Sequence, residues 1–140
     1  MQRKEFEEYV HLTFGVRADY PFENDPVSGV FRHADSGRWF AIAMNIPRRK
    51  LGTDREGYVD VVNLKCPPEI IESLVGVEDG VYRAYHMNKA HWLSVTLDGE
   101  CEDDLIEWLV SVSYTLTQKN QKSKLYELRK TQIKQTKVVK

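Results

Sequence analysis

Apolar residues recur at intervals of three and four in three stretches of the chain, which is the pattern of an amphipathic helix. We expect helices over about residues 6–14, 67–75 and 102–117. Gly15 and Gly76 stand where the first two would end. Three acidic residues, 102–104, open the third helix, where the helix dipole favours negative charge.

Shorter stretches alternate between apolar and polar residues, or are rich in valine, and these predict β-strands. They cover about residues 30–33, 38–46, 58–64, 81–85 and 92–97. In the second strand, strict alternation places Phe40, Ile42 and Met44 on one face and Trp39, Ala41 and Ala43 on the other. The order α-βββ-α-ββ-α groups the strands in hairpins. It therefore predicts an α+β domain with an antiparallel sheet and helices packed on it, rather than a doubly wound parallel sheet.

Charge is distributed unevenly along the 140 residues, although the formal net charge is only −1. Residues 118–140 hold eight basic residues and one acid, a net +7, and the preceding residues hold 12 basic and 20 acidic residues, a net −8. We interpret residues 1–117 as one acidic domain and residues 118–140 as a basic tail, either a frayed helix or disordered. The tail could follow a phosphate backbone, bind an acidic partner or fold back onto the acidic domain.

The location expected from the sequence is cytoplasmic. No stretch approaches 18 apolar residues, which predicts no membrane span, and the first residues lack the apolar core of a signal peptide. Cys66 and Cys101 are then expected to be free thiols.

The familiar catalytic signatures, such as glycine-rich phosphate loops, GxSxG, HExxH and CxxC, do not occur in the sequence. We expect no catalytic residues, no cofactor and no metal site. His86 and His91 are five residues apart, a spacing that does not place two imidazoles on one helical face. Cys66 stands at a predicted helix start, where a thiol can be activated. No base is adjacent in sequence, however, so burial is the expectation.

Two segments carry candidate binding chemistry. The loop at 48–57 is locally basic and lies between two strands, so it is either a wing that contacts phosphates or a solvated hairpin loop. The segment at 85–92, Tyr-His-Met-Asn-Lys-Ala-His-Trp, could stack bases or hydrogen-bond a ligand. It could equally be a structural turn in which Asn88 satisfies backbone groups.

Several strings in this sequence resemble the MmcQ/YjbR family of small bacterial proteins. They are VNLKCPPE at 62–69, YHMNK at 85–89 followed by HW at 91–92, LDG at 97–99 and SY at 113–114, so the resemblance covers about residues 1–117. It implies an α+β fold with a curved antiparallel β-sheet and helices packed on it, related to the folds of secretion chaperones. It also implies a "double-wing" DNA-binding arrangement of hairpins and no enzymatic activity. The chain departs from the family at Arg83-Ala84, where Pro-Gly is usual. Arg83 adds a donor beside Lys89, which suits an anionic ligand.

The favoured hypothesis is therefore a non-enzymatic DNA-binding protein that contacts phosphates through basic hairpin loops. It requires two groups of residues to share one surface despite the acidic domain. The candidate residues are Arg48, Arg49, Lys50 and Arg55 in the first group, and Lys65, Arg83, His86, Asn88, Lys89 and His91 in the second.

The alternative hypothesis is an adaptor that binds a protein or peptide, through an exposed sheet face or edge carrying Trp39 or Tyr58. A third hypothesis, an enzyme acting through Cys66 or His86, requires one pocket that joins Cys66, His86 and His91.

Overall fold

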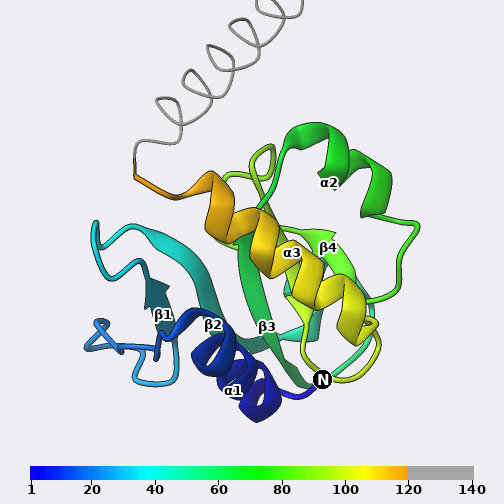
Figure 1. Ribbon diagram of the computed structural model, residues 1–140. Helices are drawn as coiled ribbons and strands as arrows, with labels where there is room; N and C mark the ends of the chain where they lie inside the picture. The colour runs from blue at the N-terminus through cyan, green and yellow to red at the C-terminus, as the bar shows by residue number, and fades with distance from the viewer. Residues whose placement is uncertain (120–140) are drawn as a thin grey trace, which may run out of the picture.

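A computed structural model describes residues 1–119 as an antiparallel sheet of five strands with three α-helices (Figure 1). The helices are α1 (Arg3–Phe14), α2 (Pro68–Leu74) and α3 (Asp103–Leu116). The strands are β1 (Gly29–Arg32), β2 (Trp39–Pro47), β3 (Tyr58–Lys65), β4 (Val81–Arg83) and β5 (Trp92–Thr96), and a short 3-10 helix, η1 (Arg48–Leu51), follows β2. The predicted fold class and element order are confirmed.

The strands are arranged in the order β1-β2-β3-β5-β4, and every neighbouring pair is antiparallel. The long strands β2 and β3 form the centre of the sheet and its longest ladder, from Ala41 opposite Leu64 to Pro47 opposite Tyr58. Helices α1 and α3 lie across the same face of the sheet, in front of it in Figure 1, and α2 lies beside β4. The opposite face has no α-helix over it among the described residues.

The main hydrophobic core lies between the sheet and α1 and α3. Phe6 and Val10 of α1 are fully buried there, as are Ile106, Leu109 and Val110 of α3. The sheet contributes inward side chains from its central strands, namely Ala41, Ala43, Val62, Leu64, Leu93 and Val95. These residues are the periodic apolar positions of the sequence, so burial of one stripe per helix accounts for their spacing.

A β-bulge at the start of β2 corrects one prediction. Phe31 pairs with Ala41, but Arg32 pairs with Trp39, so Phe40 is an additional residue in β2. Phe40 consequently packs in the core with Ala41 and against the ring of Tyr114, at 5.0 Å between centroids. Trp39 lines the opposite face with Ile42 and Met44. The strict alternation predicted for β2, with Trp39 beside Ala41, was wrong because the bulge shifts the phase by one residue.

Other predicted boundaries shift by a few residues. The strand expected at 81–85 ends at Arg83, and the polar loop after β2 contains η1. Within residues 1–119, no helix has the length and apolar character needed to cross a bilayer. Most of the predicted basic tail, residues 120–140, lies outside the described residues.

Candidate functional site

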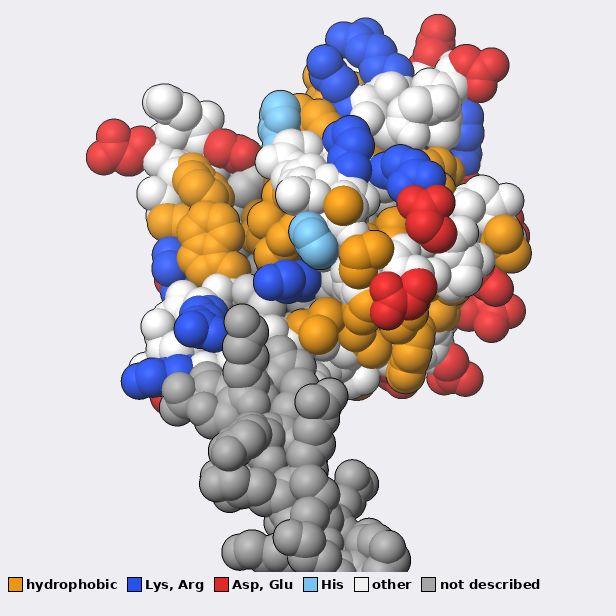
Figure 2. All heavy atoms as spheres, turned by 90° about the horizontal axis from the view of Figure 1, so that it is seen from above, with side chains coloured by type: hydrophobic (Ala, Val, Ile, Leu, Met, Phe, Trp, Pro, Cys, Tyr) orange, Lys and Arg blue, Asp and Glu red, His pale blue; other side chains and the backbone are white. Residues whose placement is uncertain are grey.

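A cleft of about 640 Å³ opens on the sheet face opposite α1 and α3. It lies between the loop at 20–28, which precedes β1, and the segment at 84–91, which connects β4 to β5. Hydrophobic side chains are visible on either side of a hollow in Figure 2. Its lining residues are Pro21, Phe22, Glu23, Asn24, Asp25, Ser28, Trp39, Ile42, Met44, Asn63, Tyr85, His86 and Met87.

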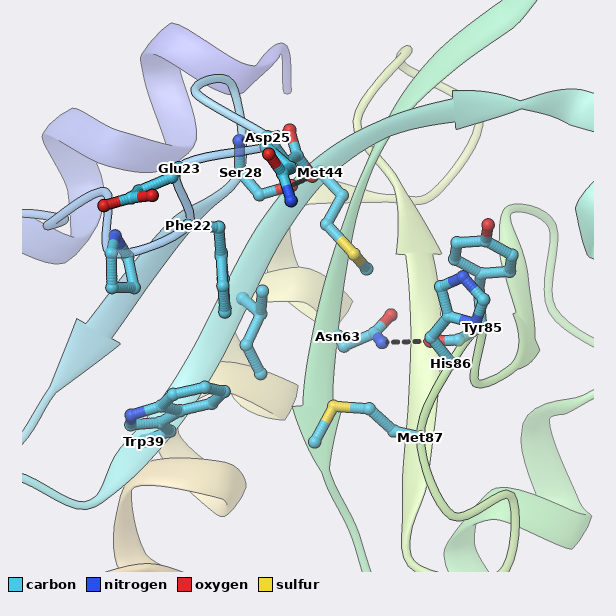
Figure 3. Close-up of a pocket in the computed structure, with 13 residues that line it drawn as sticks. Phe22, Glu23, Asp25, Ser28, Trp39, Met44, Asn63, Tyr85, His86 and Met87 are labelled. Carbon is cyan, nitrogen blue, oxygen red and sulfur yellow. Dashed lines mark hydrogen bonds between the residues drawn. The ribbon is translucent and has the colours of Figure 1, made fainter.

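The floor and walls of the cleft come from different parts of the chain (Figure 3). Ile42 and Met44 of β2 and Asn63 of β3 form the floor. The rings of Phe22 and Trp39 meet edge-on at one side, with 6.0 Å between centroids and an angle of 82° between planes. Tyr85, His86 and Met87 stand at the other side. The cleft is thus lined mainly by aromatic and thioether groups, which suits an apolar ligand group.

Asn63 holds the segment at 84–91 against the sheet. It is fully buried in β3, and its Nδ2 donates a hydrogen bond of 2.7 Å to the carbonyl of Tyr85. The Ser94 hydroxyl donates to Asn63 Oδ1 at 2.5 Å and accepts from the Tyr85 amide at 3.0 Å. A buried polar group is stable only when its hydrogen bonds are made, so this closed network fixes where the second wall begins.

His86 has a strained backbone at the edge of the cleft. Its φ is 60°, and it is the one described non-glycine residue with a positive φ. Its ring lies over that of Tyr85, with 3.9 Å between centroids. A non-glycine residue in the left-handed backbone region costs free energy, so the surrounding structure must hold it there. Residues strained in this way concentrate at functional sites. The position of His86 therefore marks the cleft as a candidate binding site.

The opposite rim, in the loop at 20–28, is acidic and is held by hydrogen bonds within the loop. Asp25 accepts hydrogen bonds from the hydroxyl of Ser28, in a short contact, and from its amide at 3.2 Å. The Ser28 hydroxyl is the main cause that lowers the pKa of Asp25. Burial opposes this shift, and the backbone amides of Ser28 and Val27 add to the lowering, so the net shift is downward. Asp25 is consequently ionised at neutral pH, and with Glu23 it places negative charge beside the apolar cleft.

A small second hydrophobic cluster joins the hairpin at 48–57 to the same sheet face. Ile46, Val59 and Val61 are buried there under Leu51 of η1 and Tyr85. The hairpin is also tied to the loop after β5, since Arg48 donates a hydrogen bond of 3.1 Å to Asp98. Burial would raise the pKa of Asp98, but hydrogen bonds from Glu100, Thr96 and Arg48 outweigh it, so the net shift is downward.

Four of the cationic residues predicted to bind DNA are engaged within the protein. Arg48 pairs with Asp98, and Arg55 pairs with Glu100. Arg83 makes a two-pronged contact with Glu72, at 2.8 and 3.2 Å, which raises the pKa of Arg83 and lowers that of Glu72. The Lys89 ammonium donates a hydrogen bond of 2.7 Å to the carbonyl of Ala84. These contacts stabilise loops and offset much of the positive charge that the sequence suggested.

The two predicted groups lie at opposite ends of β3. The 48–55 group follows Pro47, which pairs with Tyr58 at the first residue of β3, and the other group precedes Trp92, which pairs with Lys65 at the last. The strand spacing separates these ends by about 23 Å. In the view of Figure 2, basic side chains are interspersed with acidic ones. The two groups are thus separated along the sheet, and the ion pairs of Arg48, Arg55 and Arg83 reduce the positive charge that they offer to a phosphate backbone.

The remaining candidate residues divide in the same way. Arg49 and Lys50 are exposed on the hairpin at one end of the sheet. Asn88 and His91 are exposed at the other end, where Asn88 Oδ1 accepts from the Ala90 amide at 2.8 Å. Asn88 thus has the structural role in a turn that was one of its two interpretations. Lys65 is half-buried at the end of β3, and of the predicted residues His86 alone lines the cleft.

The cysteines lie away from the cleft. Cys66 and Cys101 are buried free thiols, and burial raises the pKa of each to about 11. Cys66 packs in the main core, whereas His86 and His91 are exposed, so the three do not share the pocket required by the enzyme hypothesis. Within the part of the chain that the structure describes, no three His, Cys, Asp or Glu side chains cluster as a metal site.

Sequence reasoning did not identify most of the cleft. Phe22, Met44 and Asn63 were not among the candidate site residues, although Asn63 lies within one of the strings that carry the family resemblance. A polar Asn between Val62 and Leu64 in an otherwise apolar strand was the available signal, because a buried amide requires specific partners.

Several known proteins are similar to this chain in sequence and in fold. The chain is 36% identical to YyaQ of Bacillus subtilis over 117 residues, 84% of this chain and 98% of that protein. It is 45% identical to YjbR of Escherichia coli K12 over 53 residues, 38% of this chain and 45% of that protein. A crystal structure of a Pseudomonas syringae protein matches with a TM-score of 0.80 and 40% identity, covering 84% of this chain and all of that one. A Deinococcus radiodurans protein matches with a TM-score of 0.53 and 28% identity, covering 72% of this chain and 67% of that one.

The sequence model of the YjbR family matches residues 13–116, a stretch that includes both walls of the cleft, its floor and α3. The family resemblance inferred from the motifs is thereby confirmed, and this chain belongs to the YjbR family.

Proposed function

We propose that this chain is a non-enzymatic binding protein that takes apolar side chains of a partner polypeptide into the cleft on the open face of its sheet. The observation that carries the proposal is the cleft itself. It is lined mainly by apolar side chains from its floor and both walls, and one wall is fixed by the buried Asn63 network. Apolar surface left uncovered and fixed in shape is characteristic of an interaction site.

The composition of the cleft favours a polypeptide ligand. Trp39 and Phe22 offer aromatic faces, and Met44 and Met87 offer flexible thioethers that adapt to side chains of different shape. The hollow is open to solvent in Figure 2, so a chain can cross it while one or two of its side chains enter. Asp25 and Glu23 at the rim favour basic residues next to the apolar anchors.

DNA binding remains a prediction, and the positions of the basic residues support it less well than the cleft supports polypeptide binding. The ion pairs of Arg48, Arg55 and Arg83 must be broken or shared before these side chains can neutralise phosphates. Of the candidate cations in the 48–55 hairpin, this leaves Arg49 and Lys50, a small contact surface, since duplex recognition usually involves many phosphate contacts.

The proposal can be tested with an array of 15-residue peptides of varied apolar and charged content, followed by fluorescence anisotropy on the strongest binders. We expect peptides with an aromatic or large aliphatic residue next to Lys or Arg to bind. Trp39→Ala should weaken that binding at least about tenfold. Trp108→Ala is the matched control, because Trp108 is 47% exposed on α3, on the helical side of the sheet. Equal losses in both variants, or no peptide bound, would contradict the proposal.

A mixed-sequence 20-base-pair DNA duplex serves as the competing ligand in the same assay. Phosphate-mediated binding would weaken steeply with added salt and on neutralising Arg49 and Lys50 to Ser, and would be insensitive to Trp39→Ala. We expect no such binding at 150 mM salt. A salt-dependent complex with that pattern would support the DNA hypothesis instead.

A further inference from the structure

We propose that the cleft is occupied, in the free protein, by the chain's own residues 120–140, which act as an internal competitor for the partner polypeptide. This inference rests on the proposed function, since it assigns an occupant to the same cleft. It is carried by three observations: where the described chain ends, the charge of residues 120–140, and the chemistry of the cleft.

The described chain ends beside the cleft. At the end of α3, Thr117 Oγ1 lies 2.7 Å from His33 Nε2, and the carbonyl of Gln118 accepts a hydrogen bond of 3.3 Å from Arg38 Nη1. Arg38 directly precedes Trp39, which lines the cleft. Two contacts thus hold the last described turn against the β1–β2 connection, at the end of the sheet where Trp39 stands.

The length of the remaining chain is sufficient. Twenty-one residues follow Lys119, and the first large aliphatic residue among them, Leu125, is reached after six residues. Six residues of extended chain span up to about 20 Å, so Leu125 and Leu128 can pass the sheet end and reach the cleft. A tethered segment of this length has an effective concentration on the order of millimolar, so a weak intrinsic affinity suffices for occupancy.

The charges of the two parts are complementary. Residues 120–140 hold seven basic residues and one acid, a net +6, whereas residues 1–119 hold 13 basic and 20 acidic residues, a net −7. Lys122 and Lys124 flank the approach to Leu125, and Arg129 and Lys130 follow Leu128. The acidic rim at Glu23 and Asp25 provides the matching charge next to the apolar floor. The segment has the chemistry that the cleft favours, namely apolar anchors between basic residues.

The occupant can be identified by photo-crosslinking in the full chain, with a benzophenone amino acid at position 125. We expect crosslinks to peptides from residues 20–28 and 84–91 within a single chain, and a lower yield at high salt. Glu23→Lys should lower the yield. The control Glu8→Lys reverses another exposed charge, on α1 at the opposite face of the sheet, and should not lower the yield. Crosslinks between two chains would assign the cleft to a second copy, and crosslinks scattered over the surface would leave it without an internal occupant; either result overturns the proposal.

Competition separates this proposal from the proposed function. A full chain carrying Leu125→Asp and Leu128→Asp should bind an array-derived peptide about fivefold more tightly than the unmodified chain, as expected if the segment covers the cleft about four-fifths of the time. Trp39→Ala should abolish this difference. If the two chains bind the peptide equally tightly and both lose binding with Trp39→Ala, residues 120–140 are not a competitor and the proposed function still holds. Absence of binding in both chains would overturn the proposed function itself.

Discussion

The two faces of the sheet use different interactions to hold the segments that cover them. On the helix-covered face, α1 and α3 are held by fully buried apolar side chains such as Phe6, Phe40 and Leu109. On the open face, polar contacts hold the segments around the cleft, including Asn63 with Tyr85 and Asp25 with Ser28, and only a small apolar cluster assists them.

Polar anchoring of the loops leaves the open face able to bind. Polar contacts fix the loops without using the apolar surface between them, so Trp39, Ile42 and Met44 remain available to a ligand. On the other face, the apolar side chains of the sheet are buried under α1 and α3. Four pairs of substitutions, ordered by the expected loss in free energy of unfolding, test this difference between the two faces.

The largest effect is expected at Phe40, compared with its neighbour Trp39. Phe40→Ala should lower the free energy of unfolding by about 4 kcal/mol, because it opens a cavity in the main core. Trp39→Ala should cost about 1 kcal/mol, since its half-buried ring loses mainly the contact with Phe22 and the approach of Arg32. Urea denaturation followed by circular dichroism measures both. Equal costs would mean that the bulge does not separate these two side chains.

Asn63→Ala should have the next largest effect, about 2 kcal/mol, because it leaves the Tyr85 carbonyl and the Ser94 hydroxyl without their partner. Asn45→Ala, at an exposed position whose amide bonds Asp60 at 3.0 Å, is the control and should cost less than about 0.5 kcal/mol. Hydrogen exchange of the Tyr85 amide should accelerate in Asn63→Ala alone. A cost no larger than that of the control would show that the open face does not depend on this network.

His86 tests the strain in the cleft wall. His86→Val should cost about 1.5 kcal/mol, because a β-branched residue is poorly accommodated at a φ of 60°. His86→Asn should stay within about 0.5 kcal/mol, since asparagine tolerates the left-handed region. Both variants lose the imidazole ring, so a difference between their thermal unfolding midpoints measures the cost of the left-handed backbone conformation alone. The absence of a difference would argue against the left-handed conformation.

Substitution of Asp98 is expected to lower the free energy of unfolding least, by an amount that depends on pH. Because the folded pKa of Asp98 lies below its ordinary value of 3.8, its ionised form stabilises the fold above that pH, and the contribution is lost as pH falls through the folded pKa. Asp98→Asn should therefore cost about 1 kcal/mol at pH 7, and this cost should shrink as the pH is lowered below 3.8. Asp79→Asn, at an exposed carboxylate between α2 and β4, is the control. A cost that persists unchanged at pH 2 would exclude the ion pair as its cause.

The sequence was a good guide wherever a signal was local. The stripe of α3 predicted its buried face, and turn residues located the hairpins. The motif strings also contained Asn63, Tyr85, His86 and Met87, which lie together in the cleft. The cations were harder to interpret, because Glu72, Asp98 and Glu100 neutralise arginines that are 11, 50 and 45 positions away. Their pairing follows from the strand order, which single-residue patterns do not specify.

The type and order of the elements could be read from the chain alone, because helix and strand periodicity depend on neighbours within a few residues. The chain also carried the motifs that identify the family. Three-dimensional packing was needed to establish which side of the sheet each segment covers, where the bulge turns Trp39 into the cleft and which charges remain available. These outcomes depend on contacts between residues far apart in the chain, and the free energy of such contacts exists only once the sheet has formed.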